Sequence, residues 1–117
     1  MKKQLFLLFS FLSSATFLHA QILELNPAFP TVNDIVTVTY DATQGNAALV
    51  GQSQIYCHAG LITSASTSPT NWQFVQGNWG TVDPEVAMTN IGNNKHTITI
   101  DIDQYYGFPA GTNVLKF

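Results

Sequence analysis

IVTVTY, residues 35–40, is the stretch of the sequence that most clearly predicts the fold class. β-Branched and aromatic residues alternate in it with period two, which is typical of a strand that has one buried face. Val36, Val38 and Tyr40 form one face, and the other face carries two threonines. The stretch therefore predicts a half-buried β-strand.

The same criteria predict further short strands on both sides of this one. Turn signals separate them roughly every 8–12 residues, as in antiparallel sandwiches. No segment after residue 20 shows a helical apolar period of useful length. The sequence therefore predicts an all-β, immunoglobulin-like sandwich. The other predicted strands cover residues 22–25, 54–59, 72–75, 86–91 and 95–102, with a last one beginning at residue 114.

The N-terminus has the pattern of a secretory signal peptide. Lys2 and Lys3 precede an apolar run over residues 5–18, which is shorter than the roughly 20 residues of a membrane-spanning helix. We expect cleavage after Ala20, with Ala15 as the alternative position and an uncleaved membrane anchor as the alternative reading. Residues 1–20 are thus predicted as a signal peptide of a secreted or cell-surface protein, and residues 21–117 as one domain.

Cys57 is the only cysteine in the chain, so no internal disulfide is possible. It stands in an apolar stretch, where a free cysteine behaves as a small hydrophobic residue. We expect a buried, inert thiol, with a catalytic or intermolecular role as the alternative.

The charge balance excludes two classes of partner. The chain has a formal net charge of −3 and no arginine, and its only basic residues after the predicted signal peptide are Lys95 and Lys116. Nucleic-acid binding needs a cationic track along the phosphates. Binding to an anionic membrane surface needs a basic cluster. We therefore expect neither partner, whereas the abundant Ser, Thr, Asn and Gln suit a neutral polar ligand.

The sequence shows no catalytic pattern and no cofactor site. Serines are plentiful, but no Gly-x-Ser-x-Gly turn occurs, and His58 and His96 are expected to be packed or solvated strand residues. Asp101 and Asp103 are placed on one face of a strand end, where they are weak candidates for calcium ligands. Two solvated acids are the favoured interpretation. We expect this chain not to be an enzyme.

The aromatic residues are the best candidates for a binding site. Flat rings stack on the apolar faces of sugars, while amides and hydroxyls fix the orientation of the ligand. Trp79 stands in a glycine-rich loop and is the strongest candidate, whereas Trp72 is equally compatible with a core position. The complete set of candidate carbohydrate-binding residues is Tyr56, Trp72, Trp79, Tyr105 and Tyr106.

Several motifs together resemble one family. They are PTVND with VTVTYDA (residues 30–34 and 36–42), IYCHAGLIT (residues 55–63), the segment from Trp72 through residues 79–81, and YYGFPA (residues 105–110). All resemble the N-terminal immunoglobulin-like domain of secreted bacterial α-amylase-type proteins, many of which carry a type IX sorting signal. The resemblance covers residues 27–117 and implies that a larger catalytic module follows. The apolar end of the chain, VLKF (residues 114–117), also predicts an N-terminal fragment whose last strand continues.

Two hypotheses for function follow from the residues and from the resemblance. The first is a non-catalytic accessory module that binds starch or another α-glucan through surface aromatic residues. The second is a structural spacer that packs on a downstream catalytic domain and has no ligand of its own.

Overall fold

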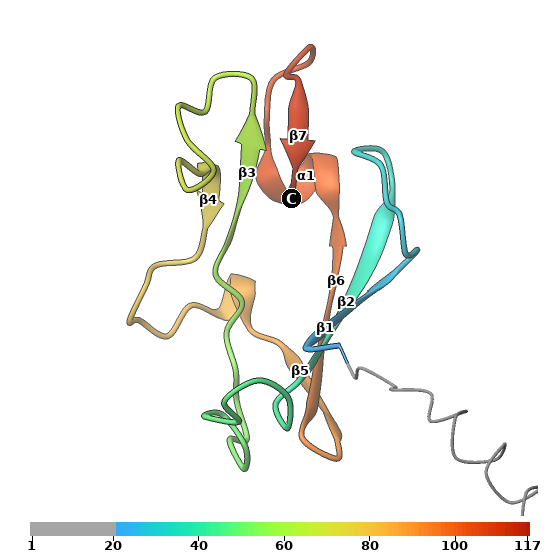
Figure 1. Ribbon diagram of the computed structural model, residues 1–117, viewed down its shortest axis with the longest axis vertical. Helices are drawn as coiled ribbons and strands as arrows, with labels where there is room; N and C mark the ends of the chain where they lie inside the picture. The colour runs from blue at the N-terminus through green and yellow to red at the C-terminus, as the bar shows by residue number, and fades with distance from the viewer. Residues whose placement is uncertain (1–20) are drawn as a thin grey trace, which may run out of the picture.

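The computed structural model describes residues 21–117 of the chain. The predicted signal peptide, residues 1–20, lies outside the described residues. Two antiparallel sheets face each other, with one short helix at one end of the space between them (Figure 1). The structure thus confirms the predicted all-β sandwich architecture.

The four-stranded sheet is built around the stretch IVTVTY. Its strand order is β1-β2-β6-β5. Val36 lies opposite Ile100, and Tyr40 lies opposite His96, so the inward faces of the two long central strands coincide. This pairing is what the period-two pattern of both segments requires. The strands are β1 (Leu23–Asn26), β2 (Ile35–Asp41), β5 (Thr89–Gly92) and β6 (Lys95–Asp101).

The three-stranded sheet is shorter and less regular, with the order β4-β3-β7. Its members are β3 (Ala59–Thr63), β4 (Gln73–Gln76) and β7 (Val114–Lys116). Ala59 pairs with Gln76 and Leu61 with Gln73, so β4 holds one residue more than the facing part of β3. Phe74 takes up this extra residue in a left-handed conformation with φ 52°. The arrangement is a β-bulge.

The short helix α1 (Ile102–Tyr106) corrects two predictions: that the strand extends to residue 102, and that no helix follows it. Asp101 is its N-cap and accepts a hydrogen bond from the backbone N–H of Gln104 at 3.4 Å. Gly107 ends the helix with φ 62°. Asp101 and Asp103 therefore do not share one face of a strand end: the first ends β6 and the second lies in the first turn of α1.

Two predicted strand positions are also wrong. Residues 54–58 are not part of a sheet, and the strand predicted there begins only at Ala59. These residues are nevertheless extended: the Cys57 N–H donates to the Val86 carbonyl at 2.8 Å, and the Met88 N–H donates to the Ile55 carbonyl at 2.8 Å. The strand predicted at 86–91 begins too early: Val86 ends a 3₁₀ turn, η3 (Pro84–Val86), and the strand itself is β5, Thr89–Gly92. The strand predicted at 72–75 is confirmed, shifted by one residue.

The core joins both sheets and the helix. Each part contributes at least one buried side chain, and these side chains form one cluster: Val36, Leu61, Ile100, Ile102 and Tyr106. Because the helix supplies two of them, α1 seals one end of the space between the sheets (Figure 1). Within residues 21–117, no helix has the length and apolar character needed to cross a membrane.

Candidate carbohydrate-binding groove

A groove of about 520 Å³ lies between the segment that precedes β3 and the loop that follows β4. This volume is typical of small-molecule sites. The rings of Tyr56 and Trp79 line it, together with His58 and apolar side chains that include Val82 and Val86. Its amide and hydroxyl groups come from Gln52, Gln54, Asn78 and Thr81. Among residues 21–117, no Asp, Glu, Lys or Arg lines this groove, so it suits an uncharged polar ligand.

A tight turn presents Trp79 to solvent. The Thr81 N–H donates to the Asn78 carbonyl at 3.1 Å, and the Thr81 hydroxyl donates to the same oxygen at 2.9 Å. Gly80 occupies the third position of the turn with φ 80°. Residues that carry a side chain rarely adopt this conformation. Trp79 is left 85 % exposed at the second position. Its ring is therefore open to contact from a ligand.

The extended segment 54–58 supplies the opposite wall. Ile55, Tyr56 and His58 all line the groove, and Ile55 is the buried one of the three. The backbone pairing with residues 86–88 keeps this segment extended. Because side chains alternate along an extended chain, the same face presents both rings.

His58 connects the groove to a second aromatic residue. Its imidazole centroid lies 5.3 Å from that of Trp79, at an interplanar angle of 69°, and 6.0 Å from that of Trp72, at 37°. Sequence reasoning did not select His58 as a site residue. Its position two residues after Tyr56 on one face of an extended segment was the available signal.

The backbone at Gly77 packs closely against side chains of Val86 and His58, where the loop that carries Trp79 begins. Gly77 has φ 88°, and a side chain there would place its Cβ 3.2 Å from a methyl group of Val86 and 3.4 Å from Nδ1 of His58. Glycine allows both the positive φ and the approach. The loop therefore begins in contact with the opposite wall of the groove.

Asn94 links the chain that enters the groove to the β5–β6 turn. Its side-chain oxygen accepts a hydrogen bond from the Gly51 N–H at 2.9 Å, just before Gln52. Asn93 and Asn94 have φ 54° and 58°, the positive φ that a tight turn between two antiparallel strands requires.

Replacing Asn94 with glycine is expected to lower the free energy of unfolding by about 1 kcal/mol, because the positive φ is kept while the bond to Gly51 is lost. Asn93→Gly is the matched control: Asn93 has the same backbone conformation, and its side chain makes no hydrogen bond in the described part of the chain. Urea denaturation of both variants measures the difference. Equal stability of the two would contradict the role given to Asn94.

Tyr105 and Tyr106 are wrong as surface platforms. Tyr106 is 5 % exposed and belongs to the core, and Tyr105 packs against that core with its hydroxyl buried. Their rings meet edge to face, 5.0 Å apart. Burial raises the pKa of Tyr106 to about 12 and raises that of Tyr105 as well, because a phenolate would be poorly solvated there. The reason is α1, which turns both side chains inward.

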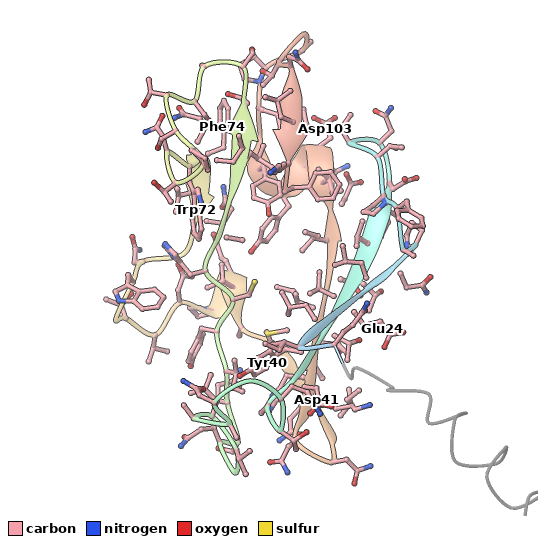
Figure 2. All side chains as sticks on the ribbon, in the orientation of Figure 1. Glu24, Tyr40, Asp41, Trp72, Phe74 and Asp103 are labelled. Atoms are coloured by element: carbon pink, nitrogen blue, oxygen red, sulfur yellow. The ribbon has the colours of Figure 1, made fainter. Side chains whose placement is uncertain are left out.

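The remaining candidates do not line the groove. Asp103 lies in the first turn of α1, whereas Trp72 immediately precedes β4 (Figure 2). Among residues 21–117, no three His, Cys, Asp or Glu side chains come together as a metal site would need. Cys57 is free and half-buried, and burial raises the pKa of its thiol, which favours the unreactive protonated form.

The comparisons with known proteins give one result. A family model described as a domain of unknown function, DUF8578, matches residues 23–117. Neither the curated proteins nor the solved structures include a match. The family match covers nearly all of the described residues. The chain therefore belongs to the DUF8578 family.

Proposed function

We propose that the domain is a non-catalytic accessory module of a secreted glycan-degrading protein of the α-amylase type, and that it binds α-glucan in the groove. The observation that carries this proposal is the composition of the groove wall. Exposed and half-buried aromatic rings stand beside neutral amides and hydroxyls, and charged side chains are lacking from the lining. Sugars present apolar C–H faces and many hydroxyls, which such a wall complements.

The division of roles follows from the positions of the side chains. Trp79 is the platform, because most of its surface is free to contact a ligand. Tyr56 forms the opposite wall. The side-chain N–H of Gln54 already donates to the Met88 carbonyl at 2.9 Å, which holds this amide in place and leaves its oxygen to accept from a ligand hydroxyl. The binding energy would come mostly from stacking, and orientation from the amides.

Removal of the indole tests the proposal. We expect native gels that contain soluble starch to retard the full chain, and Trp79→Ala to reduce its affinity at least tenfold, which corresponds to about 1.4 kcal/mol. Aromatic residues at the centre of a contact commonly contribute this much.

Phe29→Ala is the matched control, because Phe29 is another large aromatic residue, 94 % exposed, that does not line the groove. It should leave the retardation unchanged. Migration of the unaltered chain at the same rate with and without starch would overturn the proposal.

A second candidate function is the structural spacer, and one observation favours it. Trp72, Phe74 and Val75 are exposed around β4, which has a free edge in its sheet. Apolar side chains in such a place suit contact with a neighbouring domain. Unretarded migration in starch gels would favour this candidate.

A further inference from the structure

Trp72 stands next to the groove without being part of its wall. It is 46 % exposed, and the imidazole of His58 neighbours both its ring and that of Trp79. The three rings come from three different segments: the start of β4, the extended segment before β3, and the turn after β4. They form a row that we call the aromatic row, Trp72–His58–Trp79.

The middle of the aromatic row is held tightly. Nδ1 of His58 is buried and has no hydrogen-bond partner in the described part of the chain. It faces Gly77, where a Cβ would lie 3.4 Å away. No hydrogen bond therefore orients the ring through this nitrogen, and packing against the two indoles and Gly77 sets its place. His58 acts as a spacer, a positioning residue between the two tryptophans.

The Trp72 end of the row is fixed by backbone contact. A Cβ on Gly60 would lie only 2.9 Å from Cβ of Trp72, so the first residues of β4 sit directly on β3. The indole thus projects from a rigid base, although nearly half of its surface is free. A ring that is held in place and exposed loses little freedom when a ligand stacks on it.

From this arrangement we infer that the aromatic row recognises an oligosaccharide chain rather than a single sugar. One unit stacks on Trp79 in the groove, and another unit of the same chain stacks on Trp72, beyond His58. His58 pairs with each indole, whereas the two indoles form no ring pair with each other among the described residues, so we expect one pyranose ring not to cover both of them. The ligand class is an uncharged glucan long enough to reach both indoles. This inference rests on the proposed function of the groove.

Two platforms on one chain predict that affinity depends on chain length. Once the first unit is bound, the second stacking contact is intramolecular. It therefore costs no further loss of the ligand's translational freedom. Calorimetric titration of the full chain with maltose and with maltoheptaose tests this. We expect maltoheptaose to bind at least tenfold more tightly than maltose.

The variants separate the two platforms. Trp72→Ala should remove the advantage of maltoheptaose and leave maltose affinity within about twofold, whereas Trp79→Ala should weaken both ligands. Trp72→Phe keeps a ring and should restore part of the advantage, which a purely structural role would not predict. Val75→Ala is the control, because Val75 is exposed on the same strand at a site outside the row.

The outcomes distinguish this inference from the function on which it rests. Failure of both sugars to bind would overturn the proposed function and the inference with it. Equal affinity for maltose and maltoheptaose, unchanged in Trp72→Ala, would overturn the inference alone and leave the groove as a site for a single short ligand.

Discussion

Leu61→Ala is expected to lower the free energy of unfolding by about 3 kcal/mol. Leu61 lies in the middle of β3 with 0 % of its surface exposed, and it is the residue of the three-stranded sheet that enters the core cluster. Alanine would leave a cavity between the sheets, which costs both burial and packing. Small domains are stable by only about 5–15 kcal/mol, so this change removes a large part of the total.

Leu115→Ala is the matched control for this prediction. It makes the same chemical change in the same sheet, on β7, but Leu115 is 58 % exposed. Its loss should cost less than about 0.5 kcal/mol. Urea denaturation followed by tryptophan fluorescence measures both variants. Losses of similar size would show that β3 does not connect the two sheets as the structure indicates.

The long strands could be predicted because local sequence and tertiary position agree in them. In residues 35–40 and 95–101, apolar side chains alternate with threonines. The same period of two places Val36 and Ile100 in the core. The segment 54–63 contains no such agreement. Its alternating part, residues 54–58, is extended but pairs with residues 86–88 and not with a strand of the sheet. The strand β3 begins only at Ala59, next to Gly60, where the alternation ends. Pairing partners far apart in the chain decided its strand boundaries.

The helix was missed although its end signals are present. Asp101 with Gln104 three residues later, and then Gly107, mark the start and end of a helix. Five residues are too few to show an apolar period, so the sequence predicts no helix over the two adjacent tyrosines. That error explains the false platforms Tyr105 and Tyr106. Capping residues can thus mark a helix that is too short to show an apolar period.

The candidate site could be predicted only in part, because three separate segments build it. Trp79 was selected from its glycine-rich surroundings, and Tyr56 from its place on a strand face, both local signals. That residues 52–58 face residues 77–82 is a long-range contact that no local pattern reveals. His58, whose importance lies in its two aromatic neighbours, was missed for the same reason.

Gly60→Ala is expected to destabilise the domain by about 2 kcal/mol, although a strand normally prefers alanine to glycine. Alanine in place of glycine inside a strand normally stabilises it by roughly 0.5–1 kcal/mol. Here the added Cβ would lie 2.9 Å from Cβ of Trp72 and 3.3 Å from a methyl group of Val75. Because Cβ of Trp72 is fixed to the backbone, β4 itself must move. The sign of the change in unfolding free energy, measured by urea denaturation, tests the contact.

A double-mutant cycle isolates the contact between Gly60 and Trp72. Trp72→Ala keeps the Cβ that collides, so Gly60→Ala should cost about as much in that background. Trp72→Gly removes this Cβ, so the cost should fall to less than half. If instead Trp72→Ala relieved the cost as fully as Trp72→Gly, the indole and not the backbone of β4 would be the colliding group. The same shift of β4 moves Trp72 relative to His58, so Gly60→Ala should also reduce the preference for long glucan chains, which links the fold of β3 to the aromatic row.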